Sequence, residues 1–341
     1  MRKALGVVLV GLGLFGLVLT VLLPTVVVDR SKKTPLDLNI TLVSTGPAKL
    51  LDPETGELKN VRLQSTRTVK TDTSASDSKY TTVFETLCTV IITGTNTPHC
   101  VPKSDPRFLS ASSDRVTADR RTGASVNIPK YHEQINGSST YNGQPVKHVG
   151  MSYKWPIDAK KQTYQFFEPD LNEAFPAVYE GTDKIEGLTV YKYLCKTGVQ
   201  PYKVGVFDGT YDDTREVWVE PRTGVIVKGV ERQTQRIKDA NNPSGPGTLA
   251  VDTTLTFNKS AIDFQSNYAK DKINKLRMAQ LWGPLITGIL GAAALVGAYF
   301  LLRPRRTGGG DDDGRGEHLH PSPDGDPAYA EPPVGAGSSQ T

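Results

Sequence analysis

Residues 4–23, ALGVVLVGLGLFGLVLTVLL, carry no charge and have Thr20 as their only polar side chain. An α-helix rises about 1.5 Å per residue, so about 20 such residues cross the hydrocarbon core of a bilayer. Val26, Val27 and Val28 extend the apolar character. The alternative is a cleaved signal peptide, whose apolar region is usually about 7–15 residues long and ends in an A-x-A-like site. Because this run is longer and no such site follows, we predict an uncleaved transmembrane helix over residues 4–28.

A second uncharged run, LWGPLITGILGAAALVGAYFLL, occupies residues 281–302. Pro284 falls in its first turn, where the missing N–H costs little. Tyr299 and Phe300 lie near its far end, as in the aromatic belt of a membrane interface. The run predicts a second transmembrane helix at the opposite end of the chain.

Small residues recur at four-residue spacing in this second run, which allows close approach of another helix. Gly288, Gly291 and Gly297 are the candidate packing positions. The first run carries Gly6, Gly11, Gly13 and Gly16 and is the natural partner. Small residues that merely fill a lipid-facing helix would give the same pattern.

The flanking charges predict the orientation of both helices. Arg2 and Lys3 precede the first helix, and Arg303 follows the second. By the positive-inside rule, residues 1–3 and 303–341 are cytoplasmic and residues 29–280 lie outside the cytoplasmic membrane. The tail, residues 303–341, is rich in Gly, Pro and Asp and predicts disorder. Its His318 and His320 are expected to be solvated rather than to hold a metal.

Residues 29–280 show mainly a period of two, with many β-branched side chains, which is typical of strands with one buried face. Leu38, Ile40 and Leu42 alternate with polar residues, and a longer alternating series runs from Tyr80 through Phe84 to Ile92. Helical patterns occur in residues 259–280, which could run into the second membrane helix, and more weakly in residues 169–179. The predicted fold is therefore a mainly β (α+β) domain between two terminal transmembrane α-helices.

Two five-residue segments share the order acid, Pro, any residue, Thr, Gly: residues 52–56 and 220–224. Proline presets φ for a turn, and glycine accepts the left-handed conformation that closes it. We predict hairpin turns built on Pro53 and Gly56 and on Pro221 and Gly224.

The chain has three cysteines, of which Cys88 and Cys100 are the closest in sequence. Export would permit a disulfide, and these two form the most plausible pair. Cys195 would then remain as a buried thiol, although pairing with Cys195 stays open.

No nucleotide-binding, metalloprotease or nucleophile-elbow motif occurs in the sequence. His132 and Glu133 could act as an acid–base pair, but adjacent residues of a strand point to opposite faces. Asp208, Asp212 and Asp213 could form a calcium loop, although a solvated turn is the simpler interpretation. The sequence has no basic stripe with interleaved aromatic residues, so we expect no nucleic-acid partner. We expect no enzyme activity, cofactor or metal.

Residues 151–180 are dense in aromatic side chains. Trp155, Phe166, Phe167 and Phe175 are candidates for the lining of a lipid-like ligand site, with core packing as the alternative.

Residues 218–227, WVEPRTGVIV, and residues 179–188, YEGTDKIEGL, combine with the two terminal helices into a familiar layout. The layout resembles the actinobacterial PorA-type porin family over residues 1–305. The resemblance implies an envelope channel and transfers no catalytic residue. The architecture also resembles CD36-type proteins, which have two terminal anchors and a β-rich ectodomain with an apolar lipid tunnel.

The leading hypothesis from these observations is a non-enzymatic envelope protein, with membrane lipid as a partner, whose outer domain binds or transfers a lipid or an envelope polymer. A channel or porin is the first alternative, and an envelope-acting enzyme is the second. A homo-oligomer remains open.

Overall fold

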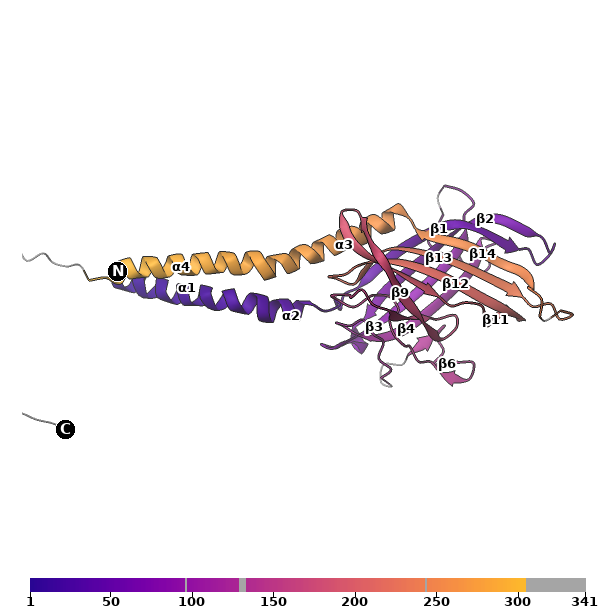
Figure 1. Cartoon of the computed structure of the whole chain (residues 1–341), viewed down its shortest axis with the longest axis horizontal. Coiled ribbons are helices and arrows are strands. Elements are labelled where there is room, and N and C mark those ends of the chain that lie inside the picture. Colours follow the sequence, from indigo (N-terminus) through magenta and orange to yellow (C-terminus); the bar gives the residue numbers. More distant parts are fainter. Residues whose placement is uncertain (96, 129–132, 243, 305–341) are drawn as a thin grey trace, which may run out of the picture.

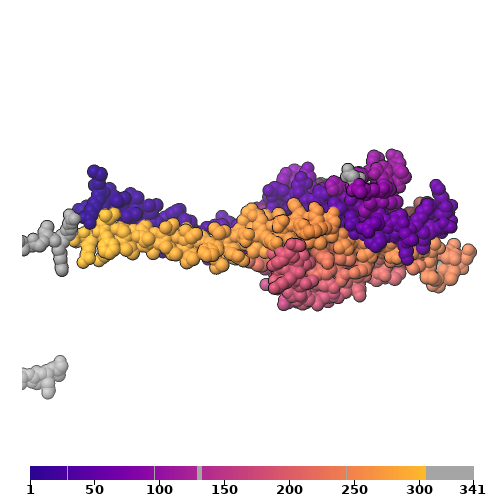
Figure 2. All heavy atoms as spheres, turned by 90° about the horizontal axis from the view of Figure 1, so that it is seen from above, coloured from indigo at the N-terminus to yellow at the C-terminus, as the bar shows by residue number. Residues whose placement is uncertain are grey.

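The computed structural model describes residues 1–95, 97–128, 133–242 and 244–304. A long pair of helices projects from one end of a β-rich body (Figure 1). Seen from above, the helical end is narrow and the β-rich end is broad (Figure 2). The predicted mainly β fold between two apolar terminal helices is confirmed. His318, His320 and most of the tail predicted for residues 303–341 lie outside the described residues.

Long helices lie at both ends of the described part of the chain. The helical elements are α1 (Arg2–Leu22), η1 (Leu23–Val27), α2 (Val28–Ser31), η2 (Thr73–Ala75), α3 (Lys259–Arg277), η4 (Met278–Trp282) and α4 (Gly283–Leu302). η1 and η4 are π-helical turns, so Arg2–Ser31 and Lys259–Leu302 are each one continuous helix. Arg2–Val27 and Lys259–Leu302 are long and apolar enough to cross a membrane. Asn258 caps α3 by accepting a hydrogen bond from the N–H of Ala261.

The two apolar helices pack closely along their lengths (Figures 1 and 2). A Cβ added at Gly291 would lie 2.9 Å from the carbonyl oxygen of Gly13. A Cβ added at Gly288 would approach the side chain of Thr20, and one added at Gly297 would make an ordinary contact with Leu9. The hydroxyls of Thr20 and Thr287 lie 3.2 Å apart and form a hydrogen bond between the helices. The small residues of α4 therefore face α1.

The β domain is built around a 12-stranded antiparallel sheet that curves into a half-barrel (Figure 1). Its order is β5-β4-β3-β2-β1-β14-β13-β12-β10-β9-β8, with β11 paired to β12, and β6 and β7 form a separate hairpin. The strands are β1 (Asn39–Leu51), β2 (Leu58–Asp72), β3 (Tyr80–Ile91), β4 (Phe108–Asp119), β5 (Gln134–Ile135), β6 (Thr140–Tyr141), β7 (Gln144–Pro145), β8 (Tyr164–Glu168), β9 (Glu173–Ile185), β10 (Leu188–Lys196), β11 (Gln200–Val204), β12 (Phe207–Glu220), β13 (Val225–Ile237) and β14 (Thr248–Phe257).

The two faces of the sheet are covered by different segments. α3 packs against a core that includes Val190, Trp218 and Val227. On the opposite face, here called the inner face, Trp155 packs among residues of β8, β9, β10 and β12, such as Tyr193. The long segment between β5 and β8 therefore fills the inner face.

The prediction of a helix over residues 169–179 is wrong, because this segment makes a turn and then enters β9. Phe175 pairs with Phe166 of β8, and Ala177 pairs with Tyr164. Phe175 and Ala177 are buried two residues apart, which is the period of a strand. Asn172 has φ of +52° and makes the turn before β9.

The two proline-containing turns join neighbouring antiparallel strands. Residues 52–56 connect β1 to β2, and residues 220–224 connect β12 to β13. The leading carboxylate accepts backbone hydrogen bonds in both, at 2.8 Å from the N–H of Glu54 and at 2.9 Å from that of Thr223. The closing glycines have φ of +72° and +70°.

Candidate functional site

The inner face of the sheet carries a group of buried charged side chains. Glu85 on β3 lies directly opposite Asp114 on β4, and Arg215 on β12 lies opposite Glu231 on β13. Glu85 and Asp114 are buried, as are Glu133, His148, Glu168 and Asp213. A buried charge is tolerated only when it is paired and hydrogen-bonded. The partners of each group therefore decide what this polar cluster can do.

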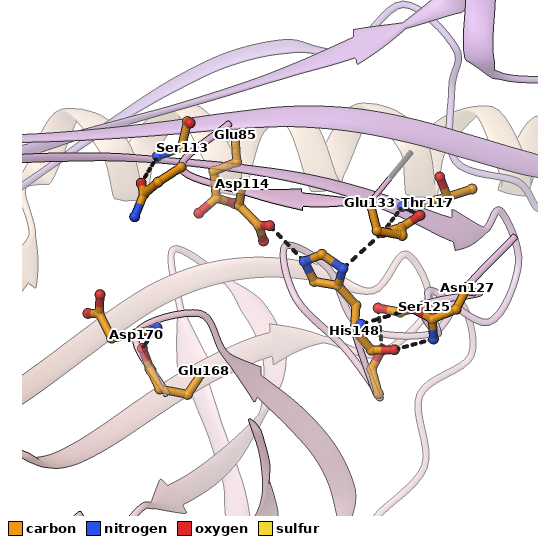
Figure 3. Close-up of polar contacts among 12 residues, drawn as sticks. Glu85, Ser113, Asp114, Thr117, Ser125, Asn127, Glu133, His148, Glu168 and Asp170 are labelled. Carbon is orange, nitrogen blue, oxygen red and sulfur yellow. Dashed lines mark hydrogen bonds and ion pairs between the residues drawn. The ribbon is translucent and has the colours of Figure 1, made fainter. Parts of the chain in front are cut away.

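His148 lies between two carboxylates (Figure 3). Its Nε2 is 2.7 Å from Asp114 Oδ1, and its Nδ1 is 2.8 Å from Glu133 Oε2. Its backbone is fixed by Asn127, whose side-chain amide both donates to and accepts from the main chain of His148. The ring also lies against Phe167, with the ring centres 4.5 Å apart and the ring planes tilted by 52°.

Burial of His148 disfavours the charged imidazole, but the hydrogen bonds to Asp114 and Glu133 raise its pKa to about 9. An imidazolium donates from both ring nitrogens, which matches an acceptor on each side. His148 is therefore a structural cation at neutral pH.

Arg215 holds the second part of the cluster. Its guanidinium lies 3.0 Å from Glu168, 3.0 Å from Glu231 and 3.4 Å from Asp213. It also lies over the ring of Phe166, at 5.3 Å from the ring centre. One cation therefore faces three carboxyl groups.

Several carboxyl groups of the cluster have raised pKa values. Burial raises the pKa of Asp213 to about 8, and burial together with Glu168 raises the pKa of Asp170 to about 7. Burial also raises the pKa of Glu85 and of Glu168. Near neutral pH, part of this cluster is therefore protonated and uncharged.

The arrangement does not assemble a catalytic nucleophile from the described residues. Cys195 is buried, and burial raises the pKa of its thiol to about 11, so it stays a thiol. No group of three or more His, Cys, Asp or Glu side chains in the described part of the chain has a metal-binding arrangement.

Several residues highlighted by the sequence lie elsewhere. His132 is outside the described residues, and its neighbour Glu133 binds His148 instead. The acidic segment that includes Asp208, Asp212 and Asp213 is not a loop but part of β12. Side chains of a strand alternate between its two faces, and Asp213 lies on the buried face. Asp208 pairs with Lys203 at 2.8 Å on the surface. These three carboxylates therefore do not form the predicted calcium loop.

The four candidate aromatic residues lie in two packed cores. Trp155, Phe166 and Phe175 share one core with Tyr193. Phe167 belongs to another core, with Ile135 and Val146. Trp155 is 0% exposed and Phe175, the most exposed of the four, is 9% exposed.

Cys88 and Cys100 are joined by a disulfide, with their Cα atoms 5.7 Å apart. The bond ties the end of β3 to the segment that leads to β4. Cys195 is free and buried.

The pairing of His148 with Asp114 and Glu133 was not predicted from the sequence. The available signal was the position of Glu85 and Asp114, which are in phase with the apolar Val83 and Val116 on the same strands. An acid at a core position of a strand indicates a buried partner.

Comparison with known proteins identifies the family. The family model described as Porin PorA matches residues 5–300, which include both helices and the β domain. A protein named Porin PorA from Corynebacterium amycolatum is 24% identical, over 87% of this chain and 97% of its own length. A second Porin PorA, from Corynebacterium resistens, is also 24% identical, over 90% of this chain and 98% of its own length. The chain therefore belongs to the PorA porin family.

Proposed function

We propose that this protein is a non-enzymatic, channel-forming protein of the cell envelope. The observation that carries the proposal is the family match over residues 5–300, because it spans the helix pair and the β domain together. Both Corynebacterium relatives, aligned over nearly their whole length, bear the name porin. The family relation favours a channel over the lipid transfer suggested by the sequence. The burial of Trp155, Phe166, Phe167 and Phe175 in closed cores points the same way.

We further propose that α1 and α4 span the cytoplasmic membrane, with both termini inside and the β domain outside. An α-helix satisfies its backbone hydrogen bonds within itself, except at its two ends, which suits a bilayer. Arg2 and Lys3 at one end and Arg303 at the other give both cytoplasmic flanks positive charge. The outward faces of the pair are apolar, with side chains such as Phe15 and Leu290 more than half exposed.

One helix pair offers few polar groups along its length. Thr20 and Thr287 bond to each other between the helices, and Thr25 bonds to the carbonyl of Val21. A water-filled path therefore has to be assembled from more than one copy of the chain. Homo-oligomerisation is part of the proposal.

The test is conductance of the full-length protein in a planar lipid bilayer. We expect discrete, reproducible current steps that are absent from a mock purification. The matched variants are Gly291→Leu, which separates the helix pair, and Gly11→Leu, which adds a side chain where nothing lies within 4 Å. Gly11→Leu should conduct like the natural protein, and Gly291→Leu should conduct less. The channel proposal would be refuted if the folded natural protein gave no current steps, or if the mock sample gave identical steps.

A further inference from the structure

A groove of about 270 Å³ lies where the helices meet the β domain. Its walls come from residues 31–35 at and beyond the end of α2, from Tyr153, Lys154 and Ile157, from the turn at 222–226 and from one side of α3. Ser31 and Ala279 mark its helix-side edge, and each lies only a few residues from an apolar run. With the helices in a bilayer, this edge is at the level of the lipid headgroups.

The interior of the groove is apolar. Leu38, Leu42 and Val69 are buried along it, and Ile226 and Leu276 complete the lining. Small-molecule sites usually have about 300–1,000 Å³. A groove just below that range is suited to one hydrocarbon chain rather than to a whole two-chain lipid.

The rim of the groove is positively charged. Its lining contains the six basic residues Lys32, Lys33, Lys154, Arg222, Lys272 and Lys275, and no Asp or Glu among the described residues. Lys32 and Lys275 are paired with Asp158 and Asp271 outside the groove.

Lys154 and Lys272 have no carboxylate partner in the described part of the chain. Lys154 Nζ donates only to the carbonyl of Thr223, at 3.0 Å, and Lys272 lies over the ring of Tyr268 at 5.2 Å. Burial and the nearby Lys272 lower the pKa of Lys154 to about 7. A bound anion would compensate both charges. Gln265, also in the lining, is buried with an Oε1 that accepts no hydrogen bond from the described residues.

We propose that this groove holds one hydrocarbon chain of an anionic bilayer lipid, with the headgroup beside Lys154 and Lys272. Charge complementarity selects the headgroup, and the continuity of the groove with the ends of the apolar helices selects a membrane lipid over a soluble ligand. The site is separate from the aromatic residues proposed from the sequence and does not depend on conductance.

The experiment uses full-length protein in nanodiscs of phosphatidylcholine that contain a small fraction of phosphatidylglycerol with a photoreactive group on one chain. After illumination, labelled peptides are mapped by mass spectrometry. We expect labels on the peptides that contain Leu38 and Leu276, and weaker labelling when unlabelled phosphatidylglycerol competes. The same probe with a phosphatidylcholine headgroup should label the groove less.

Two variants and one matched control separate binding from folding. Lys154→Gln and Lys272→Gln should each weaken groove labelling about fivefold, the effect of one charge near a membrane surface. Lys270→Gln, on the same helix but outside this groove, should leave labelling unchanged. Three outcomes would each overturn the proposal. Labels could be confined to α1 and α4, the two headgroups could label the groove equally, or the groove could crosslink to another copy of the chain.

Discussion

Gly13 of α1 and Gly291 of α4 face each other across the helix pair without room for a side chain. A Cβ on Gly291 would come within 2.9 Å of the Gly13 carbonyl oxygen, and a Cβ on Gly13 would come equally close to that of Gly291. Helices in a membrane gain little from apolar burial against each other, since lipid is equally apolar. Close packing at these glycines therefore contributes to the stability of this pair, together with the hydrogen bond between Thr20 and Thr287.

Gly291→Leu should separate α1 from α4 and destabilise the protein by about 1–3 kcal/mol, the usual effect of overpacking. The measurement is equilibrium unfolding of full-length protein in detergent micelles. Gly11→Leu is the control, because nothing lies within 4 Å of its Cβ position. Equal losses in the two variants would contradict the packing role of Gly291.

The helices and turns could be predicted from the sequence because their signals are local. Uncharged runs of membrane length and the Pro–Gly turns need no information from distant residues. The turn at residues 119–123 was missed because it lacks proline, although Asp119 accepts backbone bonds and Gly123 has φ of +70°, as in the other two.

The buried face of β3 could not be predicted, because both faces carry residues of mixed polarity. The alternation from Tyr80 to Ile92 included Phe84, which is 41% exposed in the structure. Glu85, next to it, is only 8% exposed, because Arg67 and the inner-face cluster compensate its burial. Such compensation is a tertiary effect between distant strands. The His148 site was missed for the same reason, since Asp114 and His148 are 34 residues apart.

Preventing the disulfide should destabilise the β domain. The bond closes a loop with a sequence separation of 12, and a loop of this length is worth about 3 kcal/mol in the chain-entropy model. Cys100→Ser should lower the melting temperature by several degrees and leave Cys88, which is buried in the folded protein, open to alkylation after denaturation. Cys195→Ala is the comparison, and it should not change the alkylation of Cys88. An unpaired Cys88 in the natural protein would disprove the pairing.

His148→Gln should be strongly destabilising, because it leaves Asp114 and Glu133 buried without their cation. Removing one partner of a buried charge pair typically costs about 3–5 kcal/mol. Asp114→Asn in the His148→Gln background should then cost much less than in the natural protein, which a double-mutant cycle on unfolding free energies measures. Additive losses would show that the two side chains are not coupled.

Stability should fall between about pH 6.5 and 9, and His148 sets the direction. Its pKa is raised to about 9 in the folded protein and is about 6.5 when unfolded, so its contribution is complete below about 6.5 and disappears as the pH passes 9. The difference corresponds to about 3 kcal/mol. The raised pKa values of Asp170 and Asp213 act in the same direction, because the folded state holds their protons until about pH 7 and 8. Glu231 and Lys154 act oppositely. Arg215 outweighs the burial of Glu231 and lowers its pKa, so its contribution is lost only at acid pH. Burial and Lys272 lower the pKa of Lys154 to about 7, so the cost of its burial decreases above pH 7 and offsets part of the decline.

Denaturant unfolding of the full-length protein at pH 5 to 9 should therefore show a maximum in mildly acidic solution. His148→Gln should flatten the decline above about pH 6.5, whereas His99→Gln, at an exposed position, should leave the profile unchanged. A stability that rises from pH 6.5 to 9, or a His148→Gln profile as steep as that of the natural protein, would mean that His148 is not held as a cation between Asp114 and Glu133.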